Sequence, residues 1–301
     1  MGLLDLVEEL AAAIGNTPVI ALHRIPQGLG RVYVKLEYTN PTGSHKDRIA
    51  VYMVRDAIER KLLGENGLVV EASSGNTAIS VAWVAARLGL RAVIVVKRSI
   101  SQRKKKLIEL FGARLVEVPD DMEETEVAEA LAEKLGGVYL RQYGNPANLR
   151  AHYETTGPEL YKQLGGRIDY FVMGMGTCGT LAGVGRYLRE KLGSSVRIVG
   201  VTPRGSALVG GGRGGEVIEG LATSHVPDLC KENMSLVDEI IEVSSRDAVR
   251  MALRLAREEA LPVGPSTGAA LHAALEILGR DKGARVAIIA ADNNLRYESL
   301  V

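Results

Sequence analysis

Short, continuous apolar runs recur along the chain, separated by longer segments in which apolar residues return every three to four positions. Several of the short runs are rich in Val and Ile and do not alternate with polar residues. This pattern is typical of strands buried on both faces, as in a parallel sheet. The strands that we expect span residues 31–37, 67–72, 91–96, 114–118, 137–141, 169–173, 197–201, 239–243 and 285–291.

The longer segments between these runs predict helices. Ile49, Met53 and Ala57 recur at every fourth position and form one apolar stripe. The segments 77–89 and 101–112 each end on a glycine, which is a common helix stop. Strands that alternate with helices in this way predict a doubly wound α/β fold with mainly parallel sheets.

Two glycine-bearing turns, at residues 73–77 and 174–180, each follow an expected strand and precede an expected helix. Two parallel-sheet units, each with its own turn, account for this arrangement best. Because ligands of such sheets bind at the carboxyl ends of the strands, we expect a site in a cleft between the two units. The Gly-rich segment 205–221 predicts a loop over that cleft.

Composition narrows the functional classes only a little. Of 301 residues, 46% are hydrophobic and 24% are charged, and the net charge of +1 gives no argument for nucleic-acid binding. Two cysteines, Cys178 and Cys230, are too few for a disulfide framework or a zinc site, which indicates a reducing compartment. The first residues lack a signal-peptide pattern, and no apolar run approaches the ~20 residues that span a bilayer. We therefore expect a soluble cytoplasmic protein without a metal.

The turn after residue 173 has the character of a phosphate site. Residues 174–179 match G-x-G-x-x-G, which suggests a dinucleotide. A NAD site needs an acidic residue at the end of the next strand, but the strand 197–201 is followed by Thr-Pro-Arg. The hydroxyls of Thr177 and Thr180, with backbone N–H groups at a helix N-terminus, suit one compact phosphate. A phosphate monoester, a dinucleotide and a plain tight turn remain as alternatives at this point.

The turn "SSGNT" at residues 73–77 presents small side chains and free N–H groups, which favour a carboxylate or another anion. A plain N-cap cluster is the alternative, because Ser, Asn and Thr are preferred caps.

Lys46 lies in the stretch "NPTGSHKDRIA" (residues 40–50), in the first turn of an expected helix, where the macrodipole disfavours positive charge. This position tends to lower the pKa of a lysine, and a neutral amine is what imine chemistry needs. The alternative is a surface lysine neutralised by Asp47.

A phosphate cradle, an anion-binding turn and an amine together point to pyridoxal 5′-phosphate, which has one phosphate and forms an imine with a lysine. Here the sequence resembles the cysteine synthase and cystathionine β-synthase group of the fold-type II (tryptophan synthase β-like) pyridoxal-phosphate enzymes. The resemblance runs almost end to end and rests on blocks in the family's order. These blocks are residues 14–22, 40–50, 73–77, 142–160, 174–188, 264–271 and 292–297.

The resemblance implies a role for each matched position. Lys46 would form the imine and act as the α-proton base, Asn76 would contact the ring hydroxyl, and Ser266 would face the pyridine nitrogen. The cofactor phosphate would be held by Gly176, Thr177, Cys178, Gly179 and Thr180. The substrate carboxylate would be bound by Ser73, Ser74, Gly75, Thr77 and Gln142.

The resemblance also implies the reaction and the domain organisation. The reaction would be β-replacement, in which an activated serine loses its β-substituent to give an α-aminoacrylate and sulfide then adds to form L-cysteine. A neutral serine at the ring nitrogen favours this chemistry over transamination. A smaller α/β domain would comprise residues 41–145 with the carboxylate loop, and a larger one residues 1–40 plus 146–301 with the phosphate loop. A homodimer is implied as well.

Three positions depart from the family pattern. His45 stands where a small or apolar residue is usual. Its role stays open between packing beside the cofactor and a part in the choice of donor. Cys178 replaces a common glycine and is interpreted as a tolerated small residue. Arg204 and Arg213 make the loop 202–221 more basic than in acetylserine-using relatives, so that either could bind a phosphate leaving group.

The donor therefore stays open between O-acetylserine, O-phosphoserine and serine, the last in a cystathionine β-synthase-type reaction. A serine/threonine-dehydratase-type lyase is another alternative of the same cofactor class. An NAD(P)-dependent oxidoreductase would leave Lys46 and Ser266 unexplained. A catalytically silent binding protein is disfavoured by the retained lysine.

Overall fold

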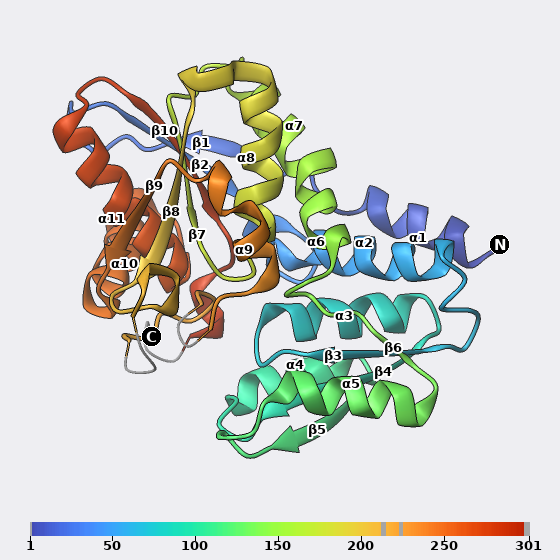
Figure 1. Cartoon of the computed structure of the whole chain (residues 1–301). Coiled ribbons are helices and arrows are strands. Elements are labelled where there is room, and N and C mark those ends of the chain that lie inside the picture. Colours follow the sequence, from blue (N-terminus) through green and yellow to red (C-terminus); the bar gives the residue numbers. More distant parts are fainter. Residues whose placement is uncertain (1, 212–214, 223–224, 298–301) are drawn as a thin grey trace. The chain divides into compact units, whose positions relative to one another are not determined.

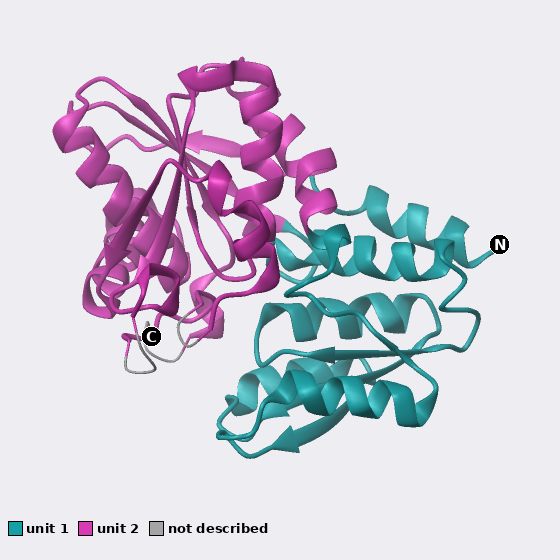
Figure 2. Cartoon of the chain, viewed as in Figure 1, with its two compact units in different colours: residues 1–15, 40–148 teal, residues 16–39, 149–301 magenta. Residues whose placement is uncertain are grey.

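A computed structural model of the chain describes residues 2–211, 215–222 and 225–297 (Figure 1). The chain divides into two compact units (Figure 2). Unit 1 comprises residues 1–15 and 40–148, and unit 2 comprises residues 16–39 and 149–301. The division differs from the expected one at the N-terminus, which we expected in the larger domain. Helix α1 (Leu3–Ala12) instead packs on α2 (Lys46–Glu59) within unit 1.

Unit 1 is built on a parallel four-stranded sheet with the order β5-β4-β3-β6. Its strands are β3 (Leu68–Ala72), β4 (Arg91–Lys97), β5 (Arg114–Val118) and β6 (Val138–Tyr139). Its helices after α2 are α3 (Asn76–Arg87), α4 (Gln102–Leu110) and α5 (Glu124–Leu135).

The central strand β3 of unit 1 is buried along its whole length because helices cover both faces of the sheet. Alternate residues Val70 and Ala72 pack with Ala128 and Ala132 of α5. Helix α3 contacts β3 and β4 and also packs against α2 and α4. The start of α2 and the start of α3 are thereby brought together at one side of the unit.

Unit 2 is built on a six-stranded sheet with the order β1-β2-β10-β7-β8-β9, in which only β1 is antiparallel to its neighbour. Its strands are β1 (Val19–Ala21), β2 (Arg31–Leu36), β7 (Tyr170–Gly174), β8 (Arg197–Pro203), β9 (Glu239–Val243) and β10 (Arg285–Ala290). Its helices are α7 (Gly157–Gln163), α8 (Gly179–Leu192), α9 (Asp228–Asn233), α10 (Ser245–Glu259) and α11 (Pro265–Arg280), while α6 (Pro146–Ala151) crosses between the units.

The two faces of the unit 2 sheet bury alternate residues of the same strands. Val172 faces a core formed with α10 and α11, whereas Phe171 and Met173 face a second core formed with α8. In Figure 1, α10 and α11 accordingly lie on one side of the sheet and α8 on the other. Since all these helices run back against parallel strands, their N-termini lie at the carboxyl edge of the sheet.

The sequence-based expectation of an α/β fold with mainly parallel sheets is confirmed. All nine expected strands form, and residues 114–118 and 239–243 have the expected bounds. The strand β1 was missed because it has three half-buried residues at an antiparallel edge. Of the expected loop 205–221, the described part has only a short 3₁₀ turn at Ala207–Val209. Within the described residues, no helix combines the length and apolarity needed to cross a membrane.

Candidate active site

Lys46 is the first residue of α2 and is half-buried. The turn that presents it is held by Asp47, whose carboxylate is fully buried. Asp47 accepts hydrogen bonds from the backbone N–H of Thr42 (2.7 Å), the Thr42 hydroxyl (2.5 Å) and the Ser80 hydroxyl (2.6 Å). A carboxylate with three short donors is a strong anchor, so Asp47 fixes the start of α2 against α3 and is not simply a surface counter-ion.

The turn 73–77 joins β3 to α3 in the same unit, and its side chains are already engaged. The Ser74 hydroxyl accepts a hydrogen bond from the backbone N–H of Lys97 (3.0 Å). The Thr77 hydroxyl donates to Gln142 Oε1 (2.6 Å), and Gln142 Nε2 donates to the carbonyl of Ala72 (3.1 Å). Gln142 therefore ties the end of β3 to the first turn of α3 and sets the shape of the predicted carboxylate-binding turn.

The other predicted residues of this turn lie where the sequence placed them. Ser73 is buried, and its Oγ accepts a hydrogen bond from the N–H of Gly75 (3.2 Å). Asn76 is the first residue of α3 and is half-buried. A helix N-terminus of this length favours a negative charge in front of it. Unit 1 therefore gathers an amine and an anion-binding turn at one edge.

Glu71, two residues before the turn, is a feature that the sequence analysis missed. Its side chain is fully buried in β3, and only Oε1 is engaged, by the N–H of Ala72 (3.0 Å), while Oε2 has no hydrogen-bond partner. Burial raises the pKa of this carboxyl to about 8, although hydrogen bonds from the backbone and the charge of Lys46 act to lower it. Lys46 is thus one of the groups whose charge acts on this buried acid, although burial outweighs it.

In unit 2, the turn between β7 and α8 contains all the residues predicted to hold a phosphate. Thr177, Cys178 and Thr180 are buried, and Gly179 begins the 14-residue helix α8. A Cβ at Gly176 would lie 2.4 Å from the carbonyl oxygen of Gly220, so that only glycine fits there. The turn thus presents backbone N–H groups and small polar side chains at a helix N-terminus, which is the chemistry of an anion cradle.

His152 orients one hydroxyl of this turn, a role that sequence reasoning did not assign. Its Nε2 lies 3.0 Å from Thr180 Oγ1, and its Nδ1 lies 2.9 Å from Thr156 Oγ1. When Nε2–H donates to Thr180, the Thr156 hydroxyl donates to Nδ1, and the Thr180 hydroxyl keeps its own proton for a different acceptor. The close approach depends on Gly183, where a Cβ would lie 2.8 Å from His152 Cβ.

Ser266 is the second residue of α11, after Pro265, and is half-buried. It lies at the carboxyl edge of the unit 2 sheet, because the chain just before it bridges to Asn293, which follows β10. The phosphate turn follows β7, the neighbour of β10, at the same edge. The structure therefore brings Ser266 and the turn 174–180 to one edge of unit 2.

The sequence also singled out Arg204, Arg213 and His45 and predicted that no metal is bound. Arg204 is exposed and near Glu216, whose pKa is lowered chiefly by hydrogen bonds from Ser245 and in smaller part by the charge of Arg204. Arg213 lies outside the described residues. His45 is buried. No cluster of metal-ligating side chains occurs in the ranges that the structure describes.

One prediction about the cysteines is wrong. Two cysteines gave no reason to expect a disulfide, but Cys178 of the phosphate turn is bonded to Cys230 of α9. Their Cα atoms are 5.1 Å apart, within the range that disulfides adopt. The pair was not visible in the sequence because 52 residues separate the two positions.

Comparison with known proteins identifies the family. The family model of the pyridoxal-phosphate dependent enzymes matches residues 10–292. Cysteine synthase 1 of Neurospora crassa is 39% identical over 96% of this chain and 81% of its own. Cysteine synthase B of Escherichia coli is 38% identical over 96% of this chain and 94% of its own. The chain belongs to the cysteine synthase family of pyridoxal-phosphate dependent enzymes.

The fold of this cysteine synthase family member is also found in solved structures. The crystal structure of an O-ureido-L-serine synthase has a TM-score of 0.90 at 38% identity and covers 96% of this chain and 92% of its own. Membership decides an alternative that the sequence left open, because the cofactor is pyridoxal phosphate and not a dinucleotide. The anion cradle of unit 2 and the amine of unit 1 are groups that this cofactor requires.

Proposed function

We propose that this enzyme makes L-cysteine by β-replacement, from an O-activated L-serine and sulfide. The observation that carries the proposal is the arrangement in unit 1, where Gln142 shapes the turn 73–77 and Asp47, next to Lys46, is hydrogen-bonded to Ser80 of α3. A substrate held by its α-carboxylate at this turn would present its α-carbon to the amine of Lys46. The cysteine synthase relatives support the same assignment.

The chain's own groups divide the work between the two units. Pyridoxal phosphate, when bound, withdraws electrons from the α-carbon of the amino-acid substrate. Lys46 takes the α-proton and later returns it, acting as general base and then general acid. One cofactor molecule would use residues of both units, with Asn76 at its ring hydroxyl and Ser266 at its ring nitrogen. Its phosphate would be held by Gly176, Thr177, Cys178, Gly179 and Thr180.

The substrate carboxylate would be bound at the turn 73–77, which Ser73, Ser74, Gly75 and Thr77 form and whose geometry Gln142 holds. Backbone N–H groups at a helix N-terminus favour this anion. Water would have to be kept from the reacting carbon, where it would otherwise compete with sulfide. The buried positions of Ser73, Thr77 and Gln142 suit that requirement.

The donor is proposed to be O-acetylserine or O-phosphoserine. Arg204 lies in an exposed loop that follows β8, and a guanidinium there could bind a departing phosphate. Its charge contributes in small part to the lowered pKa of Glu216, which is due chiefly to hydrogen bonds from Ser245. Kinetics with both donors decide between them. If an Arg204→Ala, Arg213→Ala double variant turned over O-phosphoserine as fast as the unchanged enzyme, these arginines would have no part in donor choice.

The main experiment uses the purified holoenzyme with sulfide and each donor, and measures cysteine by mass spectrometry. The Lys46→Ala variant should lose about 10²- to 10⁴-fold in kcat, because this is what proton transfer by a positioned base contributes. The Lys282→Ala variant, which changes an exposed lysine, is the control and should keep full activity. Cysteine formation by Lys46→Ala at the unchanged rate would refute the role of Lys46. A different amino-acid product would refute the proposed reaction.

We further propose a homodimer in the cytoplasm, which the family resemblance suggests. Light scattering coupled to size exclusion would measure the mass, and a monomer of 32.3 kDa would refute the dimer. The Cys178–Cys230 disulfide is compatible with the proposed cytoplasmic location, because cytosolic proteins of hyperthermophiles are rich in such bonds.

A further inference from the structure

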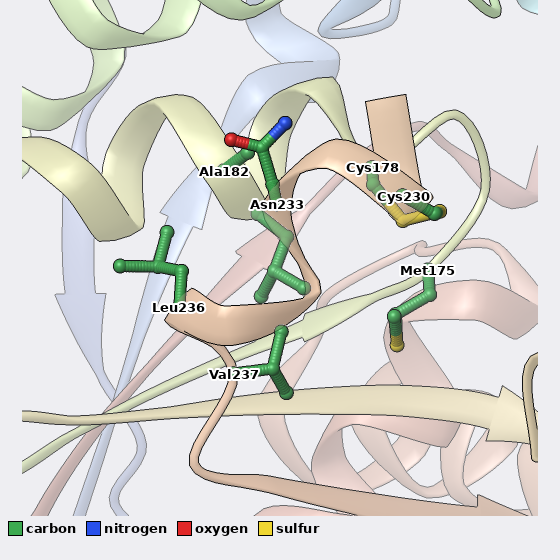
Figure 3. A pocket seen from close by; sticks show the side chains of 8 residues that line it. Met175, Cys178, Ala182, Cys230, Asn233, Leu236 and Val237 are labelled. Atoms are coloured by element: carbon green, nitrogen blue, oxygen red, sulfur yellow. A yellow bond between two sulfur atoms is a disulfide. The ribbon is translucent and has the colours of Figure 1, made fainter. Parts of the chain in front are cut away.

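The disulfide between Cys178 and Cys230 joins the phosphate turn to a distant part of unit 2. Cys178 lies between Thr177 and Gly179, at the N-terminus of α8, and Cys230 lies in the short helix α9. Figure 3 shows the bond near Met175, at a pocket that Asn233 of α9 and Leu236 also line. The bond therefore holds the residues proposed to bind the cofactor phosphate from behind.

The backbone at Cys178 shows why the turn needs support. Its φ of +64° is in the left-handed region, which glycine adopts freely and a residue with a Cβ adopts at a cost. A cysteine here would tend to relax toward a negative φ and carry the neighbouring N–H groups with it. A covalent bond to α9 opposes that relaxation. The departure from the family's glycine and the disulfide are thus parts of one feature.

The rest of the turn is held from the same side by non-covalent contacts. The N–H of Ala222 donates to the carbonyl of Met175 (2.8 Å), and Gly220 packs directly behind Gly176. Cys230 Sγ lies 3.8 Å from the carbonyl oxygen of Gly176. The disulfide is the only covalent member of this set, and it acts at the one position with a left-handed non-glycine backbone in the turn.

The surroundings of the bond indicate a permanent support. Cys178 is 4% exposed and Cys230 is 1% exposed, so that sulfide and thiols in solution have little access to either sulfur. A cavity of about 10 Å³ lies beside the bond, and side chains such as Met175, Leu181 and Leu236 line it. A cavity of this size holds at most one water, and this apolar lining offers it few partners. The turn therefore has room to shift into this space once the bond is broken.

We propose that the Cys178–Cys230 disulfide is a positioning element for pyridoxal phosphate, which holds the turn 176–180 in its anion-binding form before the cofactor arrives. The inference rests on the proposed placement of the phosphate at this turn. Preorganised sites bind more tightly because the ordering cost has already been met on folding. Loss of the bond should raise the Kd for pyridoxal phosphate about tenfold, which corresponds to about 1.4 kcal/mol.

The test compares apoenzyme in which the bond is present with the Cys230→Ala and Cys178→Ala variants. Pyridoxal phosphate is titrated at 25 °C, and the ³¹P chemical shift of the bound phosphate is recorded. Both variants should show a Kd about tenfold higher and an altered ³¹P shift.

A Cys178→Gly, Cys230→Ala double variant has no bond but tolerates the left-handed backbone, and it should recover part of the affinity. The Cys178→Ser and Cys230→Ser variants supply the same comparison if either alanine variant fails to fold.

Three results would overturn the proposal. One is a lower unfolding temperature of the variant apoenzyme with an unchanged Kd and ³¹P shift, because the bond would then only stabilise the fold. Another is the finding by mass spectrometry of two free thiols in enzyme purified without reductant. The third concerns the proposed function itself and is tested separately with Thr177→Val. If that variant binds pyridoxal phosphate as tightly as the unchanged enzyme, the phosphate does not sit at this turn.

Discussion

The buried acid Glu71 makes the stability of unit 1 depend on pH in a way that can be measured. Its carboxyl lies inside β3, and burial raises its pKa to about 8. The pKa values of Tyr139 and Tyr143 are raised mainly by burial, and the charge of Glu71 adds to this, for Tyr143 after that of Glu124. Lys46 is the nearby positive group. Replacement of Glu71 by Gln would remove the titration and keep the size of the side chain.

The sign and the magnitude follow from the pKa difference. Below pH 4.5, the ordinary value, the carboxyl is protonated in both states, and its contribution to stability is fully present. Between pH 4.5 and about 8 the unfolded chain has released this proton and the folded chain still holds it, so stability falls as pH rises. At about 1.4 kcal/mol per pH unit, the total loss approaches roughly 5 kcal/mol, as an upper figure.

The assay is guanidinium unfolding of the apoprotein at pH 5, 6, 7 and 8. The fluorescence of Trp83, the only tryptophan of the chain and a residue of α3, reports on the same unit. The difference in free energy of unfolding between Glu71→Gln and the unchanged protein should grow with pH by about 1 kcal/mol per unit. Glu65→Gln, at an exposed position, is the control and should show no such trend. A difference that stays constant from pH 5 to pH 8 would show that Glu71 is ionised when folded.

Two further predictions concern the side chains that shape each half of the site. His152→Asn should weaken pyridoxal phosphate binding about 2- to 10-fold, the effect of one lost hydrogen bond, because Thr180 loses its orienting partner. Equilibrium titration of the apoenzyme measures this, and an unchanged Kd would contradict the role of His152. Gln142→Leu should raise the KM for the amino-acid donor about tenfold or more and leave the Kd of the cofactor within about twofold, because Thr77 and the end of β3 are no longer tied together. An unchanged KM in steady-state kinetics would mean that Gln142 does not shape the carboxylate turn.

The elements of the fold were predictable wherever a strand is buried on both faces. The continuous apolar runs at 114–118 and 239–243 gave strand bounds that agree with the structure, and β10 was found within one residue. Such runs need no knowledge of the partner strand, since helices cover both faces whatever the order of the sheet. The strand β1 failed this criterion because it is an antiparallel edge with half-buried residues.

The positions of the site residues were predictable, but the contacts that hold them were not. Lys46 at the start of α2 and Thr180 at the start of α8 follow from the local pattern of turn and helix. Glu71 was missed because a glutamate within a strand usually lies on a solvated face. His152 was missed because one of its two partners, Thr180, comes from a separate helix. The sequence shows only the other partner, Thr156, which is four residues away.

The disulfide was missed for a physical reason as well. A pair of cysteines can be recognised only when the distance between them in space is known, and Cys178 and Cys230 come from different helices. The count of two cysteines pointed the other way. The departure from glycine at Cys178 was the available signal, since a residue with a Cβ at a left-handed position needs compensation from elsewhere.

Each half of the site is braced within its own unit, and this has a consequence for how the halves cooperate. Gln142 fixes the carboxylate turn of unit 1 through Thr77 and Ala72, and His152 fixes a hydroxyl of the phosphate turn of unit 2 through Thr156 and Thr180. Effects of separate sites without common contacts add to within about 0.5 kcal/mol. A double-mutant cycle on Gln142→Leu and His152→Asn should therefore be additive for the stability of the apoenzyme. In the holoenzyme, kcat/KM should be non-additive, because one cofactor molecule would then contact both halves. Additivity in both states would argue that the two turns do not serve a common ligand.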